Sequence, residues 1–380
     1  MMSRVRVALG GSLLILLTAC GSGSPPEPRT DLSEGLDGEP SVLNVYNWSD
    51  YIDPSVIEAF TEETGIRVTY DVFDSNEILE TKLLAGRSGY DLVVPGAAFL
   101  SRQIEAGVYQ PLNPDWLSNR VNLDPVLTDR VAAFDPENRY SVTHLWGTTG
   151  FGFNAEAIAA RMPEAPVDSW RLIFDPEVVS RFADCGVTLL DAPSEVVGSV
   201  LLYLGKDANS SKPEDLAAAE AVLKAIRPYI RNFDSSRYIE DLANGETCLA
   251  LGWSGDILQA KRRAVEAGKK FTVQYRIPEE GALLFFDQLA IPADAEHPRN
   301  AHRFIDFLLR PENAAKNSNF VRYANSNLAS RAQLAPEVAN DRGIYPPDAI
   351  MARTAVDLPK DLRHTRELTR LYTRVKSGRP

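Results

Sequence analysis

The stretch that decides the fold class spans residues 42–95 and reads VLNVYNWSDYIDPSVIEAFTEETGIRVTYDVFDSNEILETKLLAGRSGYDLVVP. It contains three apolar strand candidates, at 42–46, 66–72 and 90–95. After the first strand, Asp53 caps a helix that has Pro54 at its first position and stops at Gly65. After the second, Asp74 and Glu77 form a capping-box pattern that opens another helix. This alternation with short links predicts a parallel sheet covered by helices on both faces.

The same alternation returns in the middle of the chain and predicts a second α/β unit. Its candidates are the strand 187–190, a helix from Pro193, the helix 213–226, the strand 229–233, a helix near Tyr238 and the strand 248–252. A third group, residues 271–291 with the helix 301–309, has to return to one of these units. At roughly 100 to 200 residues per domain, a chain of 380 residues has room for both. The expected fold class is α/β.

Composition excludes several classes of protein. Hydrophobic residues make up 44% of the chain and charged residues 24%, which is ordinary globular usage and excludes wholesale disorder. Asp and Glu number 52 against 40 Lys and Arg, so the formal net charge is −12. We see no local basic stripe in this acidic chain, and we therefore expect no nucleic-acid partner. An acidic surface is compatible with a cationic ligand.

The N-terminus indicates export. Residues 1–19 begin with a short basic region and continue with an apolar run too short to span a membrane, which is the order of a secretory signal peptide. They lead into Leu17-Thr18-Ala19-Cys20, which resembles a bacterial lipobox, and we expect Cys20 to carry a lipid anchor. The alternative is an ordinary cleaved signal that happens to end near a cysteine. Residues 20–41, rich in Gly, Ser, Pro and acids, predict a flexible tether.

Two further cysteines, Cys185 and Cys248, each lie beside a strand candidate. In an exported protein an even pair tends to be oxidised, and we expect a disulfide between them. Two separate buried thiols remain the alternative, because the sequence gives no distance. The histidines are His144, His297, His302 and His364. No two of them have helical i, i+4 spacing, so we expect neither a metal site nor another cofactor.

Two near-matches to enzyme motifs fail on inspection. Residues 150–155 read GFGFNA and fit G-x-G-x-x-A, but the stretch lies mid-chain and its aromatic residues would crowd a pyrophosphate. Residues 252–255 read GWSG, in which the second glycine comes one residue too early for a nucleophile elbow. We therefore expect a binding protein rather than an enzyme.

Aromatic and acidic residues follow the ends of several strand candidates. The clusters are Trp48-Ser49-Asp50-Tyr51, Asp191-Ala192-Pro193-Ser194-Glu195, Trp253-Ser254-Gly255-Asp256 and Phe285-Phe286-Asp287. In open α/β sheets ligands bind beyond the carboxyl ends of strands, and in two-lobed proteins they bind between the lobes. Taken alone, each tryptophan would more often be core and each aspartate a helix cap. Together they suit an alkylammonium, since carboxylates accept its N–H bonds and ring faces cover its methylenes.

Long stretches of the chain also carry a family likeness. They are Tyr46-Asn-Trp-Ser-Asp-Tyr-Ile52, Tyr70-Asp-Val-Phe-Asp-Ser-Asn-Glu77, Tyr90-Asp-Leu-Val-Val-Pro95, Leu190-Asp-Ala-Pro193, Tyr203-Leu-Gly-Lys206, Asp241-Leu-Ala-Asn-Gly245 and Tyr345-Pro-Pro347. From about Leu43 to the C-terminus the chain resembles the polyamine-binding proteins of bacterial ABC importers, most closely those for putrescine, within the type II periplasmic solute-binding family. The resemblance implies two hinged α/β lobes with the ligand in the cleft between them.

The lobes implied by the resemblance are residues 42–147 plus about 276–325, and residues 148–275 plus about 326–380. The implied aromatic walls of the site are Trp48, Trp253, Phe285 and Tyr323, with Tyr51 adding a ring edge. Asp256 and Asp287 are the carboxylates implied to hold one ammonium. Glu195 and the pair Ser49 and Asp50 are implied polar groups and gates nearer the other end. The cysteine pair also matches a disulfide of the family.

The resemblance implies a monomeric receptor whose partners are a polyamine and the permease and ATPase subunits of an ABC importer. Putrescine is the first expectation, and spermidine, cadaverine and agmatine are the alternatives. One departure bears on this choice, because putrescine-type relatives usually carry serines where this chain has Gly96-Ala97-Ala98. Another departure is the lipobox, which keeps open a second function, that of an anchored polyamine sensor that signals to another membrane protein.

Overall fold

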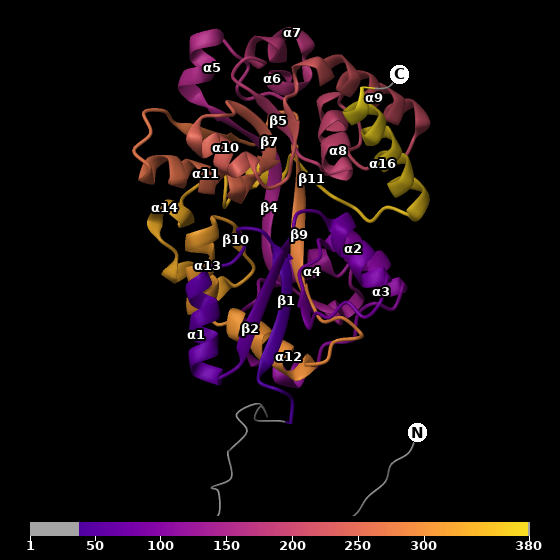
Figure 1. The fold of residues 1–380 in the computed structure, drawn as a ribbon, viewed down its shortest axis with the longest axis vertical. Coiled ribbons are helices and arrows are strands. Elements are labelled where there is room, and N and C mark those ends of the chain that lie inside the picture. Colours follow the sequence, from indigo (N-terminus) through magenta and orange to yellow (C-terminus); the bar gives the residue numbers. More distant parts are fainter. Residues whose placement is uncertain (1–37, 379–380) are drawn as a thin grey trace, which may run out of the picture.

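The computed structural model describes residues 38–378, in which two lobes are stacked along the long axis (Figure 1). We call the part with β1, β2, β3, α1, α2, α3 and α12 the lower lobe, after its place in Figure 1. The part with β5, β6, β7, α8, α9, α10, α11 and α16 is the upper lobe. The predicted signal peptide, Cys20 and residues 20–37 of the tether lie outside the described residues.

All strands of this part of the chain belong to one mixed sheet with the order β2-β1-β3-β9-β4-β7-β5-β6. The strands are β1 (Val42–Trp48), β2 (Arg67–Phe73), β3 (Leu92–Val93), β4 (Ser141–Asn154), β5 (Val187–Leu189), β6 (Asn232–Phe233), β7 (Leu249–Trp253), β8 (Val273–Arg276), β9 (Ala282–Ala290), β10 (Ala324–Asn325) and β11 (Thr354–Val356). The expected parallel pairing holds within each lobe, where β1 pairs with β2 and β3, and β5 with β6 and β7. As a description of the whole sheet it is wrong, because β9 and β4 join the two lobes through antiparallel pairs.

The helices cover both faces of this sheet (Figure 1). They are α1 (Pro54–Thr64), α2 (Asn76–Leu84), α3 (Ala97–Glu105), α4 (Pro125–Val131), α5 (Ala155–Arg161), α6 (Arg171–Phe174), α7 (Pro176–Val179), α8 (Pro193–Tyr203), α9 (Pro213–Ile226), α10 (Tyr238–Asn244), α11 (Ser254–Glu266), α12 (Pro298–Leu308), α13 (Pro311–Val321), α14 (Pro336–Ala339), α15 (Asp348–Met351) and α16 (Leu362–Ser377). Asp53 and Gly65 bound α1 as predicted. The cap of α2 is Ser75, whose hydroxyl accepts from the backbone N–H of Ile78, so the predicted Asp74 cap is wrong by one residue.

The glycines at 150 and 152 have a packing role in β4. A Cβ on Gly150 would lie 2.3 Å from the carbonyl oxygen of Arg276, and one on Gly152 would lie 2.4 Å from Ile257. Real Cβ atoms do not approach other atoms this closely, so only glycine lets β8 and α11 pack against the strand. The resemblance to a dinucleotide-binding motif therefore reflects close packing.

The chain crosses between the lobes a third time after β10, which pairs with the lower part of β4. After α15, the strand β11 pairs in parallel with β9, and α16 then packs against α8 and α9 of the upper lobe. Tyr372 on α16 donates a hydrogen bond to the carbonyl oxygen of Leu190, at the end of β5.

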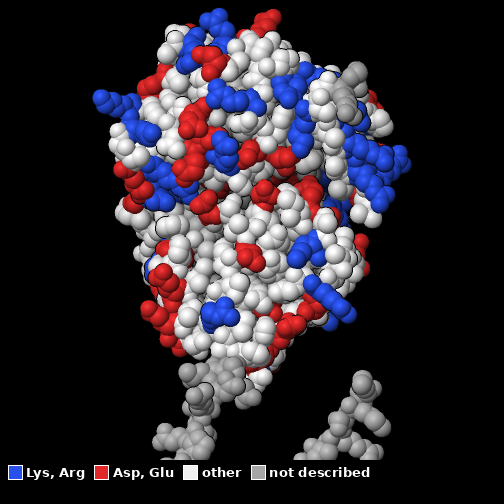
Figure 2. Space-filling view, in the orientation of Figure 1, with Lys and Arg blue, Asp and Glu red and all other residues white. Residues whose placement is uncertain are grey.

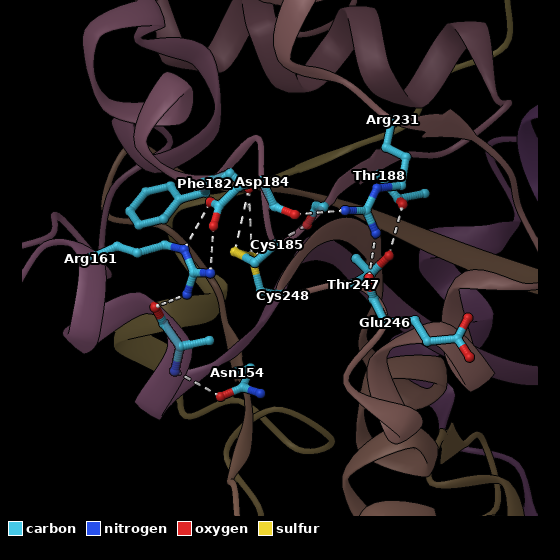
Figure 3. The surroundings of a disulfide bond; sticks show 12 residues. Asn154, Arg161, Phe182, Asp184, Cys185, Thr188, Arg231, Glu246, Thr247 and Cys248 are labelled. Atoms are coloured by element: carbon cyan, nitrogen blue, oxygen red, sulfur yellow. Dashed lines mark hydrogen bonds and ion pairs between the residues drawn. A yellow bond between two sulfur atoms is a disulfide. The ribbon is translucent and has the colours of Figure 1, made fainter.

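The predicted disulfide is confirmed. Cys185 and Cys248 are bonded, with their Cα atoms 5.5 Å apart. They precede β5 and β7, which are paired in the sheet. Figure 3 shows that Arg231 braces the same region, because its guanidinium donates to the carbonyl oxygens of Asp184 and Glu246. The bond therefore holds the beginnings of two adjacent strands together.

Replacement of both cysteines by serine is expected to lower the free energy of unfolding by about 2–4 kcal/mol, because the bond joins residues 63 positions apart and restricts the unfolded chain. Urea unfolding under oxidising conditions measures the loss. A reductant should bring the wild-type protein to the stability of the double variant and leave that variant unchanged. Equal stability of the two proteins under oxidising conditions would contradict the prediction.

Candidate binding site

The four sequence clusters meet at a cavity between the lobes. It encloses about 630 Å³ of empty space, counting the part that is open to solvent. Of the predicted site residues, those that line it are Trp48, Ser49, Tyr51, Glu195, Trp253, Asp256, Phe285, Asp287 and Tyr323. The structure therefore brings together nine of the ten residues named from the sequence, and Asp50 is the exception.

Two tryptophans provide aromatic walls from opposite lobes. The ring centroids of Trp48, at the end of β1, and Trp253, at the end of β7, lie 5.7 Å apart with the planes at 69°. Both indole N–H groups are bonded to protein, Trp48 to the carbonyl oxygen of Val94 at 2.9 Å and Trp253 to Glu195 at 2.8 Å. Because both indole N–H groups already have partners, the rings contact a ligand through their aromatic faces, which suit methylenes and cations.

Asp256 lies at the start of α11 and is held by two tyrosines. Tyr238 and Tyr323 donate hydrogen bonds to its two oxygens, at 2.8 and 2.6 Å. Burial raises the pKa of this carboxyl to about 7, although both phenols oppose the shift. The arrangement requires the glycines beside Trp253, since a Cβ on Gly252 would lie 2.4 Å from Tyr238 and one on Gly255 would lie 2.2 Å from Tyr323.

Asp287 faces the same cavity from β9. Tyr51 donates a hydrogen bond to it at 2.5 Å. The side chain is buried, and burial raises the pKa of the carboxyl to about 7. The negative charge of Asp256 adds to the shift, which places the two carboxylates within electrostatic reach of each other. A buried carboxyl whose pKa is raised further by a second carboxylate belongs to a site that favours a cation.

Glu195, the third residue of α8, adds a further carboxylate. It accepts hydrogen bonds from the hydroxyl of Thr149 on β4 and from Trp253. Burial raises its pKa to about 8. Within residues 38–378, no salt bridge joins Glu195, Asp256 or Asp287 to a basic side chain. In the described part of the chain, these three acidic groups of the cavity thus have no ion-pair partner.

Asp50 lies outside the cavity and joins the lobes instead. It has a left-handed backbone conformation with φ of 54°, and its carboxylate pairs with Arg263 of α11 at 2.5 Å. The carbonyl oxygen of Asp50 also accepts from Gln259 at 3.1 Å. The neighbouring Ser49 lies 3.4 Å, oxygen to oxygen, from Ser236 of the upper lobe. These contacts cross between the lobes beside the site.

Sequence reasoning missed several residues of the cavity wall. They are Asn76, Ser235, Leu284 and Asp357, to which Tyr238 is added as the second phenol on Asp256. Asp357 comes from the segment between β11 and α16 and has no motif around it. The one signal for Tyr238 was Gly252, where the Tyr238 ring packs directly on the backbone.

Charge is unevenly distributed over the surface. Figure 2 shows acidic side chains across the middle of one face, between the lobes, and basic side chains at the upper right, where α16 lies in Figure 1. The basic side chains of α16 were not recognised as a group in the sequence, but two of them, Arg374 and Lys376, pair with Glu220 and Asp191. Among residues 38–378, every helix is too short or too polar to span a bilayer, and no group of three or more His, Cys, Asp and Glu side chains could hold a metal ion.

Comparisons with known proteins give a consistent result. The family model described as bacterial extracellular solute-binding protein matches residues 55–346. The putrescine-binding periplasmic protein SpuD of Pseudomonas aeruginosa is 46% identical over 97% of this chain and 99% of its own length. The putrescine-binding periplasmic protein PotF of Escherichia coli is 49% identical over 90% of this chain and 94% of its own.

The fold has solved counterparts. A structure titled putative spermidine/putrescine ABC transporter, from Listeria monocytogenes, superposes with a TM-score of 0.80 at 33% identity and covers 89% of this chain and all of its own. The expected two-lobed type II fold is therefore confirmed.

The ligand-free protein is expected to lose stability as the pH rises from 5.5 to 8. The pKa of each of the three carboxyls lies near 7 or 8 when folded and near 4 when unfolded, so the folded state binds more protons in this window. Urea unfolding at both pH values should show a decrease on the order of 1–3 kcal/mol. The Asp256→Asn and Asp287→Asn variants should each show a smaller decrease. A wild-type stability that is constant or rises over this window would refute the prediction.

Proposed function

Because the chain belongs to the family of bacterial extracellular solute-binding proteins, we propose that it is an extracytoplasmic receptor that binds a polyamine, putrescine first, and delivers it to an ABC importer. The observation that carries this proposal is the set of three desolvated carboxylates, unbalanced by any salt bridge within residues 38–378, in a cavity that two tryptophans also line. The names of its relatives as putrescine-binding proteins support the choice of ligand.

Each group in the cavity has a role in this binding. Asp256 and Asp287 accept the N–H bonds of one ammonium, and Glu195 is the acidic group for the opposite end. The faces of Trp48 and Trp253 cover the methylenes and attract the charges. A bound dication removes the unfavourable burial of like charges, so ligand binding and ionisation of the carboxylates favour each other. No step of this process changes the ligand chemically.

Capture by closure of the lobes is part of the proposal. β4, β9 and the segment between β10 and β11 connect the lobes, and we assign the hinge to them, with the lobe boundaries given by the sequence resemblance. The pair Asp50 and Arg263 then acts as a gate beside the site. Its ion pair forms only where the lobes approach each other.

The proposal also includes a lipid anchor on Cys20, a monomeric state and docking to permease and ATPase subunits. The start of the described chain bears on the anchor alone, because the carboxylate of Glu39 accepts from the backbone N–H groups of Arg299 and Asn300 at the beginning of α12, at 3.0 Å each. The chain therefore enters at the lower end of the lower lobe (Figure 1), away from the cavity. An anchor that leads to this point leaves the cleft free.

Calorimetric titration of the purified protein, stripped of bound ligand, tests the function. Putrescine, cadaverine, agmatine, spermidine and spermine are compared, and the ligand is recovered afterwards. We expect a tight one-to-one isotherm with at least putrescine and chemically unchanged amine. A folded protein that gives no heat with any of these amines would exclude a polyamine receptor, and a modified amine would exclude a receptor without catalytic activity.

Asp287→Asn should weaken putrescine binding by about 2 kcal/mol or more, roughly 30-fold in Kd, because a desolvated ammonium loses its charged acceptor. Asp129→Asn, at an exposed position on α4, is the matched control and should bind as wild type does. Urea unfolding of the ligand-free proteins separates affinity from stability. Unchanged affinity in Asp287→Asn would remove this residue from the site.

A further inference from the structure

The outer face of α16 carries a row of arginines, which we call the arginine stripe. Its members are Arg363, Arg366, Arg370 and Arg374. An α-helix turns by about 100° per residue, so these four side chains fall within an arc of about 80° on one face. Only the helix brings them together, because other residues separate them in the sequence. The stripe is a line of positive charge on a protein whose formal net charge is −12.

Two arginines of the stripe have no counter-ion in the described part of the chain. Arg366 and Arg370 are exposed, and neither forms a salt bridge or a side-chain hydrogen bond there. The other two pair with glutamates of α16 and α9. The side chain of Arg363 is still 86% exposed, and ion pairs at such positions are weak and easily exchanged. At least two guanidinium groups are therefore available to a partner.

Exposed leucines lie at the beginning of the same helix. Leu362 is the first residue of α16 and is 58% exposed, and Leu358, shortly before the helix, is 46% exposed. Leu362 shares the face of the stripe, about 40° from Arg366 around the helix axis. Apolar and basic side chains on one exposed face are typical of proteins that bind at a membrane interface, where apolar groups enter the headgroup region and basic groups bind phosphates.

The geometry of the stripe favours a surface that carries many phosphates. The planar fork of a guanidinium donates two parallel N–H bonds to a phosphate or a carboxylate. From the first arginine to the last, the stripe is about 17 Å long at 1.5 Å per residue. Figure 2 shows basic side chains at this edge of the upper lobe, apart from the acidic side chains between the lobes. A convex helix with this row of charges can contact several phospholipid headgroups at once.

We propose that the arginine stripe, together with Leu358 and Leu362, docks the upper lobe onto the anionic phospholipid surface of a membrane. This inference goes beyond the proposed function, because it concerns a lipid surface and no ligand of the cavity. The described chain begins at the lower end of the lower lobe, whereas α16 lies on the upper lobe (Figure 1). Residues 20–37 can span at most about 60 Å. That length lets one membrane hold the predicted anchor and the stripe together.

Vesicle flotation tests the proposal without the anchor. The fragment 38–380 keeps every strand and helix described above and lacks Cys20. It is mixed with vesicles of phosphatidylcholine alone or of phosphatidylcholine with phosphatidylglycerol. We expect binding to the anionic vesicles to exceed binding to the neutral ones about 10-fold or more, and to be lost at high salt, because screening weakens the attraction of exposed charges.

Reversal of the two unpaired charges is the decisive variant. Arg366→Glu combined with Arg370→Glu should lower binding to the anionic vesicles about 10-fold or more. The matched control combines Arg130→Glu with Lys316→Glu, at exposed positions of α4 and α13, and changes the net charge by the same amount. It should bind the vesicles as the wild-type fragment does. Putrescine affinity should be the same in all three proteins, which also checks that each is folded.

Three results would overturn the lipid surface. The first is equal binding to neutral and anionic vesicles, or binding to neither. The second is an equal loss in the stripe variant and the matched control, because net charge would then decide binding. In the third, the stripe variant binds the vesicles as wild type does but lowers polyamine uptake by cells, which would assign the stripe to a protein partner. None of these results bears on polyamine binding in the cavity, so the proposed function is tested separately.

Discussion

The antiparallel pairing of β4 with β9 is the constraint on which the rest of the structure depends. Residues 141–149 of β4 run against residues 283–290 of β9, with one irregularity between Thr143 and Leu145. Each strand has one end in each lobe, so one sheet runs continuously through both lobes. The same pairing places Asp287 of β9 and Thr149 of β4 at the level of the cavity. The site is therefore built on the strands that connect the lobes, where rigid backbone holds charged groups in place.

In the ligand-free protein, the buried carboxylates of the site lower the stability of the fold. Asp256 and Asp287 are both 5% exposed, and burial of either as an anion is unfavourable without a cation. The tyrosines that donate to them satisfy their oxygens but add no positive charge. A well-packed apolar residue would stabilise the fold more at either position. Function therefore accounts for these residues better than stability does, as is common for titratable groups in clefts with strongly shifted pKa values.

Much of this could be predicted because local chemistry determined it. Pro54 with its capping aspartate, and the glycine that ends α1, specify that helix from neighbouring residues alone. The aromatic and acidic clusters followed strand ends, and parallel strands bring their ends to one edge. What was missed depends on contacts between distant segments. Asp357 reaches the cavity through the pairing of β11 with β9, which leaves no local pattern. Tyr238 reaches Asp256 by packing on Gly252, and this glycine alone does not say which residue packs on it. The antiparallel centre was missed for the same reason, since strand order is not encoded in the alternation of strands and helices.

The contacts between the lobes explain why closure should depend on a ligand. Beside the site they consist of a partly exposed ion pair, Asp50 with Arg263, and a pair of serine hydroxyls 3.4 Å apart. An ion pair of this kind contributes about 0–1 kcal/mol, which is less than the effective penalty for removing even one carboxylate from water. Closure without a ligand would bury three carboxylates, and the weak contacts between the lobes would offset only a small part of the desolvation penalty. A bound diamine makes closure favourable, because the same carboxylates then bind its ammonium groups. Selectivity and closure then have one physical origin, the unbalanced negative charge of the cavity.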